Sequence, residues 1–167
     1  MGLITRIACI AGLAAIAACA ERASTAASGD LFRAALPGEW QEVSARSDLV
    51  VYRSGDGQSR VTFSTLLAKE PMSEAKQHET LQTLTEHHRT AQLAVSDQVT
   101  LTPVESSEAQ VTARFQGNDP DNRRRTATLL LGAPRGVVIV HLEAIGVEQP
   151  AFAAQAEKLF AGVETVK

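Results

Sequence analysis

Two apolar runs separated by a short turn constrain the fold of this chain more than any other feature. Residues 129–131 (Leu-Leu-Leu) and 137–140 (Val-Val-Ile-Val) are continuously apolar, and the segment between them contains Pro134 and Gly136, which favour turns. A strand without polar alternation is typical of a strand that is buried on both faces. The sequence therefore predicts a hairpin inside a sheet that is covered on both sides.

Further strands are expected before and after this hairpin. A strand begins near Leu31, and β-branched and aromatic residues predict strands at residues 48–53 and 60–67. The Gly-Asp-Gly sequence at residues 55–57 predicts the hairpin turn that joins the last two. Residues 99–104, 110–115, 125–131 and 137–144 give four more strand candidates, which we expect to run antiparallel as a meander.

Two helices are expected to cover the sheet. Ser73 is a suitable N-cap for a helix that ends at about residue 91. Pro150 opens a second helix with one apolar face, made of Phe152, Ala156, Leu159, Phe160 and Val163. The predicted fold class is α+β, with an antiparallel sheet of about six or seven strands between two helices in the order βββαββββα.

The N-terminus predicts export. Arg6 precedes an apolar run of about twelve residues, which is too short for a membrane-spanning helix of roughly 20 residues. Residues 16–19 (Ile-Ala-Ala-Cys) resemble the lipobox of bacterial lipoproteins. Cleavage after Ala20, with residues 18–20 as an A-x-A site, is the alternative.

The lipobox resemblance implies the organisation of the chain. Residues 1–18 are expected to be a signal peptide, and Cys19 is expected to carry a diacylglyceryl group and an amide-linked fatty acid such as palmitate. A flexible tether would follow to residue 29, and residues 30–167 would form a single α+β domain. No Asp follows Cys19, a pattern similar to that of outer-membrane lipoproteins that face the periplasm if the source is Gram-negative.

Charge and cysteine content exclude several classes of protein. Sixteen Lys and Arg against 19 Asp and Glu give no cationic field for nucleic acid. Both cysteines, Cys9 and Cys19, precede the domain. Disulfides, thiol catalysis and cysteine-bound metals are therefore not expected in the domain.

The Pro-Gly-Glu-Trp sequence at residues 37–40 is part of a wider resemblance. Together with the order of elements and the 55–57 hairpin, it is similar to the Mog1/PsbP-like families, including the DcrB-like (DUF1795) lipoproteins, over residues 31–167. Members serve as photosystem accessory proteins, a nuclear-transport cofactor, secretion chaperones and envelope lipoproteins. The resemblance implies function through protein contacts and supplies no catalytic motif, and a fold alone does not choose among these roles.

His141 and Glu143 are the best acid/base candidates in the sequence. Residues two apart in a strand project from the same face. The alternative interpretation is that this face of the strand becomes polar toward its end. No nucleophile motif of the G-x-S-x-G type accompanies them, so we do not expect an enzyme.

No metal site or cofactor is predicted. Gln82 stands where a zinc-protease motif that starts at His78 needs its second histidine. Leu130 stands where a calcium loop that starts at Asp119 needs its acidic ligand. We expect His88 to pack beside the sheet, and His78 and His87 to face water.

Arg123, Arg124 and Arg125 form the densest charge cluster, and we take them as a candidate contact patch for a partner protein or for anionic lipid headgroups. The alternative is a solvated run that Asp119 and Asp121 neutralise. Taken together, the sequence favours a noncatalytic envelope lipoprotein that is held to the membrane by its lipid and recognises another envelope protein. A periplasmic carrier of a small apolar or anionic ligand, bound between sheet and helix, is the alternative.

Overall fold

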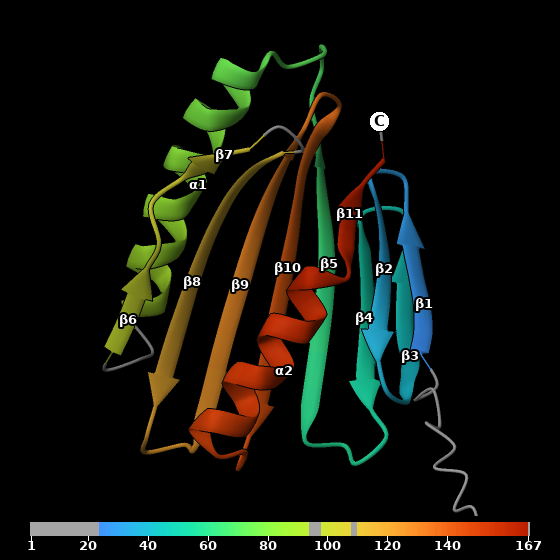
Figure 1. Cartoon of the computed structure of the whole chain (residues 1–167), viewed down its shortest axis with the longest axis vertical. Helices are drawn as coiled ribbons and strands as arrows, with labels where there is room; N and C mark the ends of the chain where they lie inside the picture. The colour runs from blue at the N-terminus through green and yellow to red at the C-terminus, as the bar shows by residue number, and fades with distance from the viewer. Residues whose placement is uncertain (1–23, 94–97, 108–109, 167) are drawn as a thin grey trace, which may run out of the picture.

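The computed structural model describes residues 24–93, 98–107 and 110–166 (Figure 1). The predicted signal peptide and Cys19 lie outside the described residues. The elements, in chain order, are β1 (Ser24–Gly29), β2 (Phe32–Pro37), β3 (Trp40–Arg46), β4 (Leu49–Ser54), β5 (Ser59–Leu67), α1 (Glu74–Leu93), β6 (Gln98–Leu101), β7 (Glu105–Ser106), β8 (Val111–Asp119), β9 (Arg124–Ala133), β10 (Gly136–Ile145), α2 (Gln149–Ala161) and β11 (Val163–Thr165).

The larger of two sheets has eight strands. Its order is β3-β4-β5-β10-β9-β8-β6, with β7 paired to β8, and neighbouring strands are antiparallel. The apolar runs of β9 and β10 lie in the interior of this sheet and are buried, except for the half-buried Ile139. The predicted central hairpin and the α+β fold class are therefore confirmed.

One face of the larger sheet is covered by α2 and by a smaller sheet of order β1-β2-β11 (Figure 1). Helix α2 buries Phe152 and Leu159 here, and Phe32 of β2 stacks on Phe63 of β5 with 4.6 Å between ring centroids. These side chains belong to the larger of two apolar clusters. Burial of this apolar area is the main stabilising contribution to the fold.

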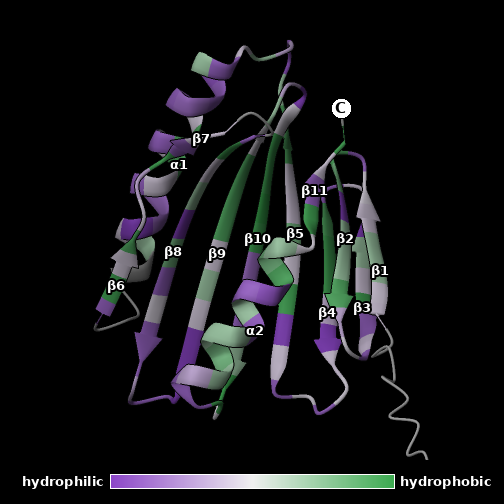
Figure 2. Ribbon diagram, in the orientation of Figure 1, coloured by the Kyte–Doolittle hydropathy of each residue, from purple (hydrophilic) through white to green (hydrophobic). Residues whose placement is uncertain are grey.

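The opposite face is covered by α1 over part of its width. Helix α1 packs mainly on β6, β8, β9 and β10, where Leu81 is fully buried in a second cluster with Phe115 and Leu130. Most residues of α1 are hydrophilic (Figure 2). The Lys76 N–H donates to Ser73 Oγ at 3.3 Å, as expected of the predicted N-cap. One helix on each face, as predicted, accounts for the two-sided burial of β9 and β10.

The predicted tether is wrong from Ser24 onward. Residues 24–29 form β1, which pairs along its whole length with β2, and Ala27 is only 3% exposed. The small residues of this segment show no alternation of apolar and polar side chains. An outer strand of a small sheet can nevertheless form with a single buried side chain on its inner face. The folded domain therefore includes Ser24 and does not start at residue 30.

The predicted number and order of strands are also corrected. Among the described residues, five strands precede α1 and five lie between the helices, where three and four were expected, and the eight-stranded sheet exceeds the predicted six or seven. Val163 belongs to β11 instead of the last helix, because Gly162 ends α2 and its N–H donates to the Leu159 carbonyl at 3.1 Å. Val163 is buried as predicted, at 3% exposure.

Candidate functional site

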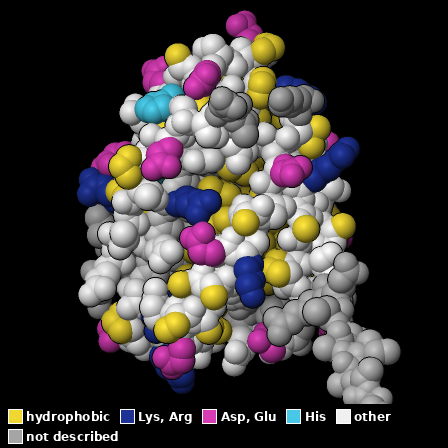
Figure 3. Space-filling model, viewed as in Figure 1, with side chains coloured by type: hydrophobic (Ala, Val, Ile, Leu, Met, Phe, Trp, Pro, Cys, Tyr) yellow, Lys and Arg dark blue, Asp and Glu magenta, His cyan; other side chains and the backbone are white. Residues whose placement is uncertain are grey.

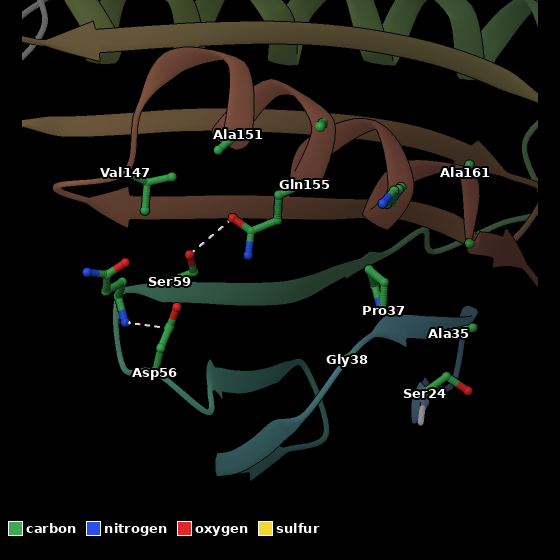
Figure 4. Close-up of a pocket in the computed structure, with 14 residues that line it drawn as sticks. Ser24, Ala35, Pro37, Gly38, Asp56, Ser59, Val147, Ala151, Gln155 and Ala161 are labelled. Atoms are coloured by element: carbon green, nitrogen blue, oxygen red, sulfur yellow. Dashed lines mark hydrogen bonds between the residues drawn. The ribbon is translucent and has the colours of Figure 1, made fainter. Parts of the chain in front are cut away.

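A groove with a volume of about 900 Å³ runs along α2 (Figure 4). Its lining positions on α2 recur every three or four residues, so they form one stripe of the helix. The other walls come from β1, β2 and the turn between β4 and β5. We call this site the α2 groove; it is lined by Ser24, Ala35, Pro37, Gly38, Asp56, Gln58, Ser59, Val147, Ala151, Ala154, Gln155, Lys158, Ala161 and Gly162.

Small side chains keep the α2 groove open. Ala151, Ala154 and Ala161 are exposed along it, because a methyl group does not fill the space between the helix and the facing strands. Apolar side chains gather on this face of the molecule, with charged side chains scattered around them (Figure 3). The volume lies within the range of about 300–1,000 Å³ that small-ligand sites occupy.

The turn between β4 and β5 forms one wall of the groove. Asp56 Oδ1 accepts hydrogen bonds from Ser54 Oγ at 2.5 Å and from the Gln58 N–H at 2.9 Å, and Gly57 has a φ of 73°, which favours glycine. The hydrogen bonds from Ser54 and then from Gln58 lower the pKa of Asp56. The predicted hairpin is confirmed, and its carboxylate is bonded within the turn itself.

The Pro-Gly-Glu-Trp segment forms a second wall. Pro37 and Gly38 line the groove, whereas Trp40 is 7% exposed and its indole Nε1–H donates to the Pro37 carbonyl at 3.2 Å. The Trp40 N–H donates to Thr25 Oγ1 at 3.2 Å. The segment thus joins β1 to β3 and shapes the rim of the groove.

The polar groups of the groove differ in how they are paired. Ser59 Oγ donates to Gln155 Oε1 at 3.1 Å and connects β5 to α2 (Figure 4). Lys158 is the basic residue of the lining and Asp56 is the acidic one. Within the described part of the chain, Lys158 is exposed and forms no ion pair.

His141 and Glu143 lie on the same face of β10, as predicted, but they bond to different partners. His141 Nδ1 and Thr128 Oγ1 of β9 are 2.8 Å apart. Glu143 Oε2 accepts from Arg60 at 3.0 Å and from Arg124 at 3.2 Å, and the Glu143 side chain is 13% exposed. The pair lies on the face of the larger sheet opposite to α2, so it is separate from the α2 groove.

Burial changes the acid–base chemistry of His141. Desolvation lowers its pKa to about 4, with smaller contributions in the same direction from Arg124, His88 and Arg60, and an opposing one from Glu143. At neutral pH the imidazole is therefore uncharged. A hydrogen bond to a threonine hydroxyl and a carboxylate held by two arginines are arrangements that stabilise a sheet.

The structure brings two of the three consecutive arginines together: Arg123 and Arg125 line one small pocket at the β8–β9 turn, and Arg124 points to the other face of the sheet. Arg123 is exposed in the β8–β9 turn, with a φ of 51°. Arg124 bonds to Glu143 on the face that carries α1. Arg125 points to the α2 face, where it donates to the Val147 carbonyl at 2.8 Å and to Gln149 Oε1 at 3.0 Å. Arg125 thereby fixes the start of α2 and, with it, one end of the α2 groove.

The other histidines lie on α1. The ring of His88 packs on Phe115 with 5.4 Å between centroids, and burial, followed by the charge of His87, lowers its pKa. The predicted contact of His88 with the sheet is confirmed. His87 is exposed as expected, and His78 is half-buried instead of facing water fully. In the described ranges, no three His, Cys, Asp or Glu side chains are placed to hold a metal ion.

The sequence patterns do not predict the residues that line the α2 groove. The available signal was the alanine content of α2, whose sequence QPAFAAQAEKLFA places small residues on both sides of the helix. Helical spacing predicts the apolar side of α2 and gives no role to its other alanines. Alanine has the highest helix propensity, so alanines that face away from the core do not by themselves predict a groove.

Comparisons with known proteins give a fold and no function. No protein-family model matches the sequence, and no curated protein matches it. The structure is similar to a crystal structure of a protein from Bacteroides thetaiotaomicron VPI-5482, with a TM-score of 0.54 and 12% sequence identity over 88% of this chain. The chain spans about half of that protein, 49% of its length, and a likeness at this identity concerns the fold alone. Among the described residues, neither helix is long and apolar enough to cross a membrane.

Proposed function

We propose that the protein is a noncatalytic lipoprotein of the cell envelope that binds a small ligand in the α2 groove. The single observation that carries this proposal is a groove of about 900 Å³ whose walls are small or apolar side chains with a few polar groups. That combination is the usual composition of a small-molecule site. The carrier that was the alternative interpretation of the sequence is therefore the function we favour.

The lipobox supports a location at a membrane. Cys19 lies five residues before Ser24, and Ser24 lines the groove. A chain spans at most about 3.5 Å per residue, so an acylated Cys19 would hold Ser24 within roughly 18 Å of the bilayer surface. In a Gram-negative cell the groove would then lie in the periplasm beside the outer membrane, within reach of apolar molecules in that membrane.

The contacts of the acid/base candidates support a noncatalytic role. His141 is bonded to Thr128, and Glu143 is bonded to Arg60 and Arg124, so both side chains are engaged in cross-strand contacts. The Pro37–Trp40 turn and a sheet with a helix on each face are in accord with the Mog1/PsbP-like resemblance, and we propose that the chain is a member of those families.

Recognition of an envelope protein is the second candidate function. Helix α1 packs mainly on β6, β8, β9 and β10, and Leu66 at the end of β5 is 47% exposed on the face of the sheet that carries α1. Leu67 is 62% exposed on the opposite face. Exposed apolar side chains on the uncovered part of a sheet favour a protein contact. Arg124 bonds to Glu143 on the face of the sheet opposite to Arg125, so the contact patch that the sequence suggested is reduced to Arg123 and Arg125.

A cysteine-protection experiment tests ligand binding, because the described domain contains no cysteine. The full chain carries Ala154→Cys in the groove or, as the matched control, Ala153→Cys, which lies one position away on α2 and is not part of the lining. Each protein is placed in phosphatidylcholine nanodiscs and treated with a charged, water-soluble maleimide, with and without dodecanol. We expect dodecanol to slow the labelling of Cys-substituted position 154 by about tenfold and to leave position 153 unchanged.

Labelling of the unsubstituted chain gives the background and reports whether the thiol of Cys19 is blocked by lipid. Equal effects of dodecanol at both positions, or no effect at position 154, would contradict ligand binding in the α2 groove. Reaction of Cys19 itself with the maleimide would contradict the lipid attachment separately.

A further inference from the structure

The charges of the α2 groove point to a chemical class of ligand. We propose that the ligand is an amphiphile with one apolar chain and a single anionic head, and that Lys158 binds the head. This inference rests on the proposed function, because it specifies the occupant of the same groove.

The two charged side chains in the lining, Asp56 and Lys158, differ in their pairing. Asp56 already accepts two hydrogen bonds within its own turn, so it is bonded without a ligand. Lys158 forms no ion pair within the described residues. An anionic group in the groove would satisfy Lys158, whereas a cationic group would bring a second positive charge next to it.

Lys158 lies near one end of the α2 groove. The lining stripe of α2 extends from Ala151 to Ala161, which is about 15 Å at 1.5 Å per residue. Lys158 lies near the end marked by Ala161, and Ala154, Ala151 and Val147 follow toward the other end. A head at Lys158 would therefore direct an extended chain along these small apolar side chains.

The polar side chains of Ser59 and Gln155 in the groove are hydrogen-bonded to each other. Ser59 Oγ donates to Gln155 Oε1 across the groove at 3.1 Å, so an apolar chain that passes over this contact leaves that donor and that acceptor paired. Buried polar groups without partners would oppose an apolar ligand. The groove thus accepts a chain over the Ser59–Gln155 contact and a charge at Lys158.

Protection of the Ala154→Cys protein by three probes tests this inference. The probes are dodecanoate, dodecanol and dodecylamine, which share one chain and differ in charge at about pH 8.5. We expect dodecanoate to protect at an about fivefold lower concentration than dodecanol, since an exposed ion pair contributes up to about 1 kcal/mol. Dodecylamine should protect least, and added salt should weaken protection by dodecanoate only.

Substitutions of Lys158 locate the head group. Lys158→Glu in the Ala154→Cys protein should abolish the preference for dodecanoate, and Lys158→Arg should retain it. Lys76→Glu, an exposed lysine on α1, is the matched control and should change nothing. The Arg variant also separates a charge effect from any loss of helix stability, because either cation suits the C-terminal turn of α2.

The outcomes distinguish this inference from the proposed function. Equal protection by dodecanoate and dodecanol, or a preference that persists in Lys158→Glu, would overturn the anionic head while the groove remains a ligand site. Failure of all three probes at position 154 would overturn both.

Discussion

His141 is the residue whose chemistry is changed most by its surroundings. It is a histidine on an interior strand, bonded to Thr128, with a pKa that burial lowers to about 4. The unfolded chain has the ordinary histidine pKa near 6.5. Between pH 6.5 and 4 the unfolded state therefore binds more protons than the folded state, and the free energy of unfolding decreases as the pH falls.

This difference predicts a measurable pH dependence. From pH 6.5 to pH 4.5 the wild type should lose on the order of 2 kcal/mol of unfolding free energy through His141 alone. Urea unfolding at both pH values checks this against His141→Gln, which cannot take up the proton. His78 on α1 contributes to the pKa of neither His141 nor His88, so it supplies the control, and His78→Gln should follow the wild type. A His141→Gln protein with the same pH dependence as the wild type would refute the buried neutral imidazole.

The arginine run shows what sequence can and cannot predict about single residues. Alternation along a strand implies that Arg124 and Arg125 point to opposite faces. In the structure Arg124 bonds to Glu143 on one face, and Arg125 bonds to the residues before α2 on the other. The shared face of His141 and Glu143 followed from the same rule. The alternation rule does not predict their partners Thr128, Arg60 and Arg124, because these contacts depend on the register of β10 with β9 and β5.

At the scale of elements, β1 is the clearest difference between expectation and structure. Sequence patterns identify strands by apolar alternation, and STAASG offers only small residues. The strand forms because β2 supplies a partner along six residue pairs and because Ala27 fits against the core. Tertiary pairing of this kind leaves no local signal.

A pair of neighbouring alanines tests whether β1 is part of the fold. Ala27→Glu places a charge in the core and should reduce the free energy of unfolding by about 2 kcal/mol or more. Ala26→Glu places the same charge on the exposed side of the strand and should change the free energy by less than about 0.5 kcal/mol. Chemical denaturation of both variants gives the answer. If both variants are as stable as the wild type, the segment acts as the tether that the sequence suggested.

For helix α2, the sequence predicts the buried side of the helix but not the groove beside it. Its buried side followed from helical spacing, and Phe152, Ala156, Leu159 and Phe160 are all buried. Its alanine side carries the candidate site. Spacing identifies the apolar stripe of a helix but gives no indication of whether the residues beside that stripe meet another element or an open groove.

At the scale of the whole molecule, the layers could be predicted and the groove could not. Two continuous apolar runs were enough to predict an interior hairpin with a helix on each side. The groove depends on the position of the smaller sheet relative to α2. Contacts between distant segments fix this position, such as the hydrogen bond that the Ala35 N–H donates to the Gly162 carbonyl at 3.0 Å. No local pattern in either segment encodes that distance.

We propose that the α2 groove carries an anionic amphiphile, and native mass spectrometry of the full chain isolated from cell membranes is the strongest test of this proposal. We expect an acylated Cys19 and a noncovalently bound amphiphile that is absent from Ala154→Trp, which fills the groove, and present in the wild type and in Ala153→Trp. A bound molecule retained equally by both variants, or carried by neither variant nor by the wild type, would contradict it.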